Sequence, residues 1–447
     1  MQIRKLVAVV ALCLVAAIVA SAQTIQFKDF KLRNGLRVIL SEDHSAPTYS
    51  LVMTYNVGSR DERPGRTGFA HLFEHMMFEG SENVGKGEHG LSIINSGGTR
   101  NGTTNSDRTN YFETLPSNQI DLGLFLESDR MRSLVINQVN FENQRNVVQE
   151  ERRRSYDNQP YGKTSEAILD TVYDSFPYKH STIGSMEDLN AAKIEDVAAF
   201  FKTYYAPNNA VLTMVGDFKV DEVTAKIEKY FGSIPAQPAP PLVDMVEPKQ
   251  SAERRRTVQD PLALVPRLSI VFKIPQGNTP DWYTLLVAGQ VLSGGESSRL
   301  YQRLVKESQV ATAVGAAAQD RRGPSTFTIT VDLQRGKNPA DAEKLIYEEL
   351  EKLKNEPVTN AELEEFRIAL RRNEVEQLVG TLTRAQNLGT LAVYYDDPGL
   401  INTRGQKLRT VTREQIQKTA RTYFIETNRT VVLTTPVSQT PGTGGGR

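Results

Sequence analysis

A proline-rich stretch without hydrophobic periodicity, 233–248, divides the sequence into two halves. Proline removes a backbone donor and fixes φ, so such a stretch is typical of a semi-rigid linker. Short alternating runs typical of β-strands and longer segments with helical periodicity follow in the same coarse order on both sides of it. We therefore expect an α+β protein of two homologous domains, each an antiparallel sheet covered by helices, joined by this linker.

The bounds of these units follow from where regular periodicity begins and ends. The first half opens with two alternating runs around Asn34-Gly35, a strong signal for a hairpin turn. The last expected strand precedes a glycine-rich tail of low complexity. We expect a first domain over 23–232, the linker over 233–256, a second domain over 257–435 and a disordered tail over 436–447.

The amino-terminal residues have the pattern of a secretory signal peptide. Arg4 and Lys5 precede an apolar run, 6–19, and the small residues Ala20-Ser21-Ala22. The run is short for a membrane span, which disfavours a retained anchor and favours cleavage after Ala22. The single cysteine, Cys13, lies inside this run, so we expect neither a disulfide nor a lipid anchor in the mature protein. These features predict an exported, periplasmic protein.

The charge balance argues against a nucleic-acid-binding protein. The chain has 53 basic and 53 acidic side chains, and removal of the leader takes away two basic ones. Nucleic-acid recognition needs a strongly basic face, which this composition does not favour. No second apolar run of membrane length follows the leader, so we expect no membrane attachment of the mature form.

The pentapeptide His71-Leu72-Phe73-Glu74-His75 lies in a segment, 67–78, with apolar residues at helical spacing. On a helix, residues three and four apart share a face, so His71, Glu74 and His75 converge. This is the inverse of the common H-E-x-x-H zinc motif: two imidazole ligands, with a glutamate able to act as a base on water. The pattern predicts a catalytic metal site.

A plainer interpretation is that these histidines are ordinary hydrogen-bonded helix residues. Three polar groups within an apolar helix nevertheless cost free energy unless they have partners, and a metal would satisfy all three. A catalytic zinc usually takes three protein ligands. The highly charged segment 140–158 offers candidate carboxylates for the third ligand, among them Glu142, Glu150 and Glu151.

Two segments together resemble a known family. The motif at 71–75, followed by Asn-Gln-Arg-Asn-Val-Val-Gln-Glu-Glu-Arg-Arg at 143–153 and Tyr-Asp-Asn-Gln-Pro-Tyr-Gly at 156–162, is similar to the inverzincins of the pitrilysin/insulysin family. The similarity is greatest to short, two-domain bacterial peptidases related to mitochondrial processing peptidase. It implies one Zn²⁺ per chain, held by His71, His75 and Glu151, with Glu74 as the catalytic base.

The resemblance also implies how a substrate is held. Relatives bind an extended peptide as an added strand at a sheet edge beside the metal, and Asn101, Gly102 and Thr103 match that segment. An ordinary edge strand is the plainer interpretation. Some relatives carry a further acid seven residues before the third ligand. Here that position is Gln144, which puts an acidic role there in doubt.

The second half departs from the family pattern. Residues 293–301 resemble the family's glycine-containing approach to a helix. Shortly after it, many relatives carry an Arg and a Tyr that reach the substrate. Here the corresponding residues are Val305 and Thr312, which cannot replace a guanidinium and a phenol. This departure predicts a heterodimer in which a homologous subunit supplies the Arg/Tyr pair.

The resulting functional hypothesis is a zinc-dependent endopeptidase that hydrolyses extended peptides or unfolded segments, as the metal-bearing subunit of that heterodimer. The alternative is a non-catalytic assembly or scaffold subunit of the same fold. The metal set distinguishes the two, since a scaffold has little use for His71, Glu74, His75 and Glu151 in register.

Overall fold

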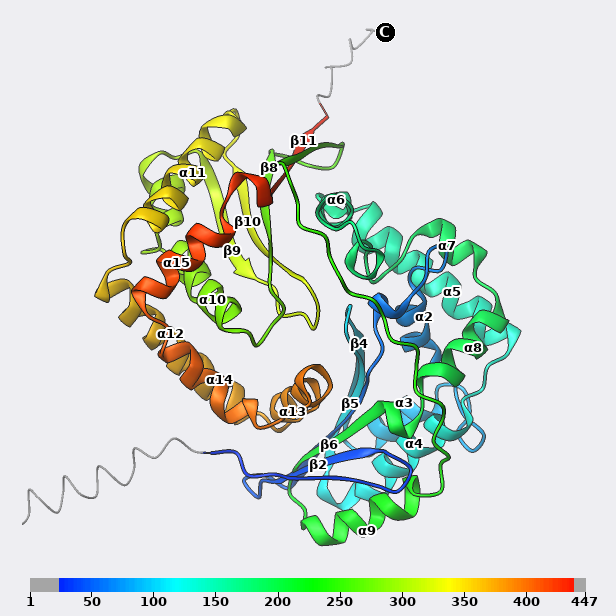
Figure 1. Ribbon diagram of the computed structural model, residues 1–447. Helices are drawn as coiled ribbons and strands as arrows, with labels where there is room; N and C mark the ends of the chain where they lie inside the picture. The colour runs from blue at the N-terminus through cyan, green and yellow to red at the C-terminus, as the bar shows by residue number, and fades with distance from the viewer. Residues whose placement is uncertain (1–23, 438–447) are drawn as a thin grey trace, which may run out of the picture.

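The computed structural model describes residues 24–437 (Figure 1). The expected signal peptide, and the tail after Val437, lie outside these residues. Within them the first domain contains a six-stranded sheet in the order β1-β2-β6-β3-β5-β4. Its strands are β1 (Lys28–Lys31), β2 (Arg37–Glu42), β3 (Thr48–Tyr55), β4 (Thr99–Thr104), β5 (Thr109–Pro116) and β6 (Ala210–Gly216).

The second domain repeats this arrangement with a five-stranded sheet in the order β7-β11-β8-β10-β9. Setting β1 aside, the order of strands along the chain matches position by position, which confirms two homologous α+β domains. The strands are β7 (Arg254–Asp260), β8 (Arg267–Ile274), β9 (Ala311–Ala318), β10 (Ser325–Leu333) and β11 (Arg429–Pro436).

Both sheets are mixed, which corrects the expectation of purely antiparallel sheets. β6 runs parallel to β2, and β11 runs parallel to β7, while the other pairs are antiparallel. Each of these last strands returns to its sheet after a long helical excursion, the kind of crossover that parallel pairing requires. Alternation within a single strand carries no information on this pairing.

Helices cover the sheets and connect their strands. The first half contributes α2 (Phe69–Met76), α3 (Glu88–Asn95), α4 (Ile120–Ser133), α5 (Gln138–Arg152), α6 (Gly162–Val172), α7 (Met186–Ala191), α8 (Ile194–Tyr204) and α9 (Val220–Phe231). The second half contributes α10 (Pro280–Ser293), α11 (Pro339–Asn355), α12 (Asn360–Val379), α13 (Thr381–Tyr395), α14 (Leu400–Arg409) and α15 (Arg413–Tyr423). A π-helical segment, Arg153–Asp157, continues α5.

Each half lends one helix to the sheet of the other. α13 packs on β3 and β6 of the first sheet, where Leu388 and Ala385 join a buried cluster with Val52 and Ile39. α6 packs on the second sheet, and Val172 there lies in a buried cluster with Val271 of β8. Figure 1 shows α13 beside the strands of the first domain, with α14 next to it. The domains are therefore interlocked.

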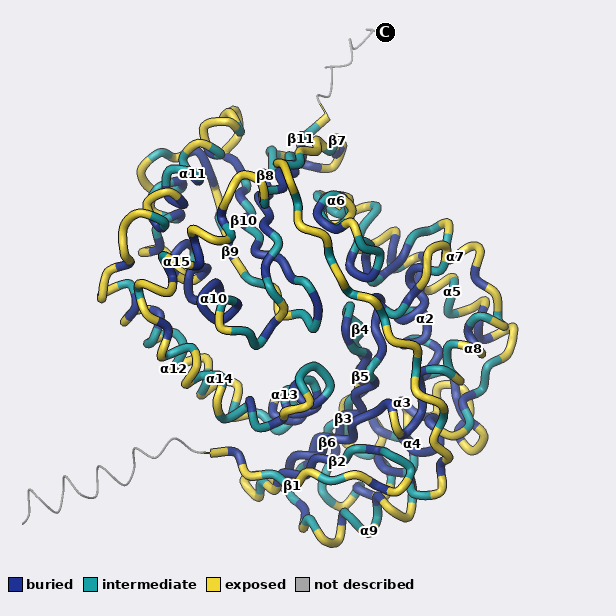
Figure 2. The backbone as a smooth tube through the Cα atoms, viewed as in Figure 1, coloured by how far each residue is buried: buried dark blue, intermediate teal, exposed yellow. Residues whose placement is uncertain are grey.

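This exchange requires a break that the periodicity did not predict. The pattern over 360–389 is typical of one long helix, but Gly380 is extended, with ψ of 129°, and separates α12 from α13. The connection after α9 lacks helix or strand until β7, which begins at Arg254, inside the stretch expected to be linker. Figure 2 shows this connection mostly exposed and the central strands buried. Within residues 24–437 no helix has the length and apolar character needed to cross a bilayer.

Candidate metal centre

The motif helix α2 begins at a glycine in the left-handed region, since Gly68 has φ of 87°. The buried carboxylate of Glu62 accepts hydrogen bonds from the backbone N–H groups of Gly68 (2.9 Å) and Ala70 (2.8 Å). These bonds satisfy donors that a helix start leaves free. The apolar side chains Phe69, Leu72, Phe73 and Met76 are buried and fix the rotation of the helix.

The structure brings His71, His75 and Glu151 together between α2 and the carboxyl end of α5. Nε2 of His75 lies 3.3 Å from Oε2 of Glu151, and Nε2 of His71 lies 3.7 Å from Oε1 of the same carboxylate. One ligand atom from each residue falls within 4.8 Å of the others. Glu150 instead pairs with Arg153 at 3.1 Å and is largely exposed, so only the second of the adjacent glutamates faces the histidines.

The chemistry of this donor set fits a zinc ion. Two imidazole nitrogens and one carboxylate are a common protein ligand set for catalytic zinc, which binds deprotonated donors. Burial, together with the neighbouring His75, lowers the pKa of His71 to about 4. A hydrogen bond from His75 lowers the pKa of the Glu151 carboxyl. At neutral pH both groups are thus in the form that binds a metal.

The side chain of Glu74 extends from the motif helix α2 toward the edge strand β4. Its Oε2 accepts a hydrogen bond of 2.6 Å from the hydroxyl of Thr104. A Cβ atom built on Gly102 would stand 3.0 Å from Oε1, so the glycine allows the carboxylate to approach the strand closely. Burial raises the pKa of Glu74, which makes the carboxylate a better proton acceptor.

The segment matched to substrate binding lies on β4, which among the described strands pairs with β5 alone. The turn bond from Asn105 N–H to the carbonyl of Arg108 fixes which residues of β4 face β5. By alternation the backbone of Gly102 faces the open edge, and its N–H donates to the side chain of Asn101 at 2.9 Å. Asn101 is exposed and Thr103 half-buried.

Gln144, where some relatives carry an acid, connects His75 to a nearby carboxylate. Its amide donates to Oε1 of Glu79 at 2.5 Å, and Lys86 lies 2.6 Å from the other oxygen. The pKa of His75 is raised although burial alone lowers it, because hydrogen bonds with Glu151 and Gln144 favour the charged ring. An acid, Glu79, is therefore present near the metal centre, but it reaches His75 through Gln144 and not directly.

Sequence reasoning missed two residues that contact this site, Thr104 and Glu79. Thr104 directly follows the segment matched to substrate binding. Its position opposite Glu74 depends on how β4 packs on α2. Glu79 follows the motif directly, so its closeness along the chain was an available signal. Val305 and Thr312 lie in the second domain, where Val305 packs against the core and the hydroxyl of Thr312 bonds to the carbonyl of Asp332 at 3.2 Å.

A second group of residues of metal-ligating types is buried, with His89 on α3, Glu113 on β5 and Glu127 on α4. Arg130 already engages both oxygens of Glu127, with Nε 3.0 Å from one of them. Burial lowers the pKa of His89, and the positive charges of Arg130 and Arg100 lower it further. The carboxylate of Glu127 is thus already paired with a buried guanidinium, which does not favour a divalent cation beside it.

Comparison with known proteins covers both halves of the chain. Residues 37–185 match a family described as insulinase (peptidase family M16), and residues 191–370 match the peptidase M16 inactive domain. The chain is 30% identical over 412 residues to the zinc protease PqqE of Helicobacter pylori, covering 91% of this chain and 92% of that protein.

Two further relatives bear on the fold and the family. A crystal structure of a protease from Helicobacter pylori superposes with a TM-score of 0.88 at 28% identity, covering 92% of this chain and all of that one. A probable mitochondrial-processing peptidase subunit beta of Arabidopsis thaliana is 25% identical over 267 residues, 58% of this chain and 49% of that protein.

Proposed function

Since the chain belongs to the insulinase family of peptidases, M16, we propose that it is an exported zinc-dependent endopeptidase that hydrolyses extended peptides or unfolded segments. As a homologue of zinc proteases it carries a candidate His-His-Glu metal site. The observation that carries the proposal is the convergence of His71, His75 and Glu151 with Glu74 held beside them against an edge strand.

In this proposal His71, His75 and Glu151 hold one Zn²⁺ per chain. A bound zinc ion supplies Lewis acidity, which polarises a peptide carbonyl and lowers the pKa of water toward about 7. The protein contributes the orientation of the three donors. α2 fixes the histidines one helical turn apart, and α5 brings the carboxylate to them.

Glu74 acts as the proton carrier. Its carboxylate accepts a proton from the attacking water and later delivers it to the leaving amine. The bond from Thr104 holds one oxygen, which leaves the other free to accept the proton. Because burial raises the pKa of Glu74, its carboxylate holds the transferred proton more readily than an exposed glutamate would.

The substrate lies as an added strand along β4. The backbone of Gly102 faces the open edge, but the residue is buried and the side chain of Asn101 covers its N–H. A peptide that adds as a strand would displace this side chain and take over the main-chain hydrogen bond. Pairing of this kind recognises extended backbone more than side chains, which favours unfolded segments over folded proteins. Asn101, Gly102 and Thr103 are thus the proposed substrate-binding residues.

The active unit is a heterodimer with a homologous subunit. Neither Val305 nor Thr312 can supply the guanidinium and phenol that many relatives place at these positions, so a partner provides them. Export follows from the leader pattern over 1–22. The scaffold alternative is disfavoured, because assembly alone needs no metal ligands and no buried base beside them.

The substitution Glu74→Gln tests the proposal. The variant should bind one zinc per chain, as the wild type does, and lose cleavage of an unstructured peptide by at least about 100-fold, in the range expected for removal of a general base. Glu150→Gln is the matched control, since that side chain is exposed beside a proposed ligand and should leave both properties unchanged. Full cleavage by a zinc-loaded Glu74→Gln protein, purified with its partner, would refute the assignment.

A further inference from the structure

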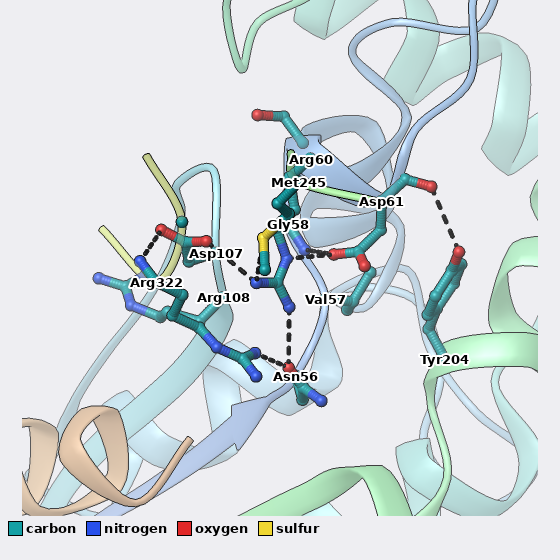
Figure 3. Close-up of polar contacts among 12 residues, drawn as sticks. Asn56, Val57, Gly58, Arg60, Asp61, Asp107, Arg108, Tyr204, Met245 and Arg322 are labelled. Atoms are coloured by element: carbon teal, nitrogen blue, oxygen red, sulfur yellow. Dashed lines mark hydrogen bonds and ion pairs between the residues drawn. The ribbon is translucent and has the colours of Figure 1, made fainter. Parts of the chain in front are cut away.

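A buried carboxylate lies in the turn that joins β4 to β5. Asp107 is 1% exposed, and its Oδ1 accepts hydrogen bonds from Nη1 of Arg60 (3.2 Å) and from the hydroxyl of Tyr178 (2.7 Å). Figure 3 shows Asp107 and Arg60 in this cluster, with Asn56 below the guanidinium. The proposed metal centre and base do not include this group.

The second domain reaches into the same cluster through the turn between β9 and β10. The backbone N–H of Arg322 donates to Oδ2 of Asp107 at 3.2 Å, and the N–H of Gly323 donates to the hydroxyl of Tyr178 at 2.9 Å. The side chain of Arg322 also bonds to Asn56 (Figure 3). Donors from both domains thus converge on one buried carboxylate.

The β9–β10 turn packs so closely against Tyr178 and Met245 that no side chain fits at Gly323. A Cβ atom there would stand 2.6 Å from Cε2 of Tyr178, 2.8 Å from its hydroxyl and 3.0 Å from Sδ of Met245. Contacts this short require a displacement of the turn or of the phenol ring. Because Tyr178 holds Asp107, a displacement would reach the carboxylate directly.

The residues around Asp107 connect along the chain to two parts of the proposed active site, the start of α2 and the side chain of Glu74. Arg60 belongs to a short 3-10 helix, Ser59–Asp61, whose first N–H groups bond to the carbonyls of Asn105 and Ser106 in the β4–β5 turn. The next residue, Glu62, caps α2. On the other side the turn follows Thr104, which holds Glu74.

We infer that the β9–β10 turn of the second domain positions the edge strand and the base of the first, with Asp107 as the positioning residue. Among the strands of residues 24–437, β4 pairs with β5 alone, so the geometry of its open edge depends on the turn that ends it. Withdrawal of the second domain would leave a buried carboxylate and a buried phenol short of donors, which costs free energy. The domain described as inactive therefore completes the site of the other.

The role of β4 and Glu74 in catalysis rests on the proposed function, but the coupling itself does not. Hydrogen exchange of the backbone amides in 99–110 measures it without zinc or substrate. The test compares Gly323→Ala and Asp107→Asn with Gly315→Ala, a control on the neighbouring strand β9 whose new methyl group would meet open space. Arg322→Ala, which removes the side-chain bond to Asn56 and a positive charge near Asp107 but keeps the backbone donor, replaces either variant that does not fold.

Exchange in 99–110 should accelerate by about tenfold in the two test variants and stay unchanged in the control. For zinc-loaded protein, kcat should fall by about tenfold while zinc content stays at one per chain, a loss that reduced folding alone would not produce. Unchanged exchange in folded Gly323→Ala and Asp107→Asn proteins, or equal acceleration in Gly315→Ala, would overturn the inference. A zinc-loaded wild type that stays inactive with its partner subunit present would refute the proposed function and leave the exchange result decisive.

Discussion

Replacement of Gly102 by alanine should reorient the proposed base without disturbing the metal ligands. The new methyl group would lie 3.0 Å from Oε1 and 3.1 Å from Cγ of Glu74, closer than van der Waals contact allows. The carboxylate is the far end of a flexible side chain, so it rotates away more readily than the backbone moves. Rotation breaks its bond to Thr104.

The size of the effect follows from that bond. A hydrogen bond to a charged group contributes about 1.5–3 kcal/mol. If the base must recover this orientation in the transition state, kcat should fall by roughly 10- to 100-fold. The melting temperature should change little, since the strain falls on the far end of one side chain and β4 keeps its pairing with β5.

The assay is cleavage of an unstructured peptide by zinc-loaded protein with its partner present, measured as kcat and KM separately. Thr104→Val removes the same hydrogen bond at nearly constant shape and should give a similar loss. The double variant should lose little more than either single one, because both changes act through one bond. Wild-type kcat in Gly102→Ala, or fully additive losses, would refute the reasoning.

Three further results are expected. Glu79→Gln should weaken zinc binding by about 10- to 100-fold in equilibrium dialysis, because the chain of hydrogen bonds that orients His75 loses its charge, whereas unchanged affinity would contradict that role. Leu388→Ala should destabilise the protein by about 2–5 kcal/mol in urea unfolding, since it opens a cavity where α13 meets the first sheet, and a loss below about 1 kcal/mol would contradict the interlocked packing. The isolated chain should bind zinc yet cleave weakly, and a homologous subunit with the Arg/Tyr pair should raise kcat, so full activity of the isolated chain would remove the case for a partner.

The sequence predicted what depends on local spacing. The face shared by His71, Glu74 and His75 is a property of any α-helix, and the hairpin predicted around Asn34-Gly35 is the antiparallel pair of β1 and β2. The choice of Glu151 over Glu150 came from the family resemblance, and its side chain is the one that meets the histidines.

The remainder depends on contacts between distant segments. The exchange of α6 and α13 between domains, and the parallel pairing of β6 and β11, depend on tertiary packing that a single sequence does not encode locally. β7 was missed because it is a polar edge strand that begins with three consecutive arginines and has one apolar residue, Val258. The Asp107 cluster joins residues from four segments, so nothing in the short-range pattern pointed to it.

Anomalous diffraction at the zinc edge, from crystals of the Glu74→Gln protein grown with one equivalent of zinc, locates the metal. A single strong peak is expected within coordination distance of His71, His75 and Glu151. No peak there, or a stronger peak at His89, Glu113 and Glu127, would contradict it.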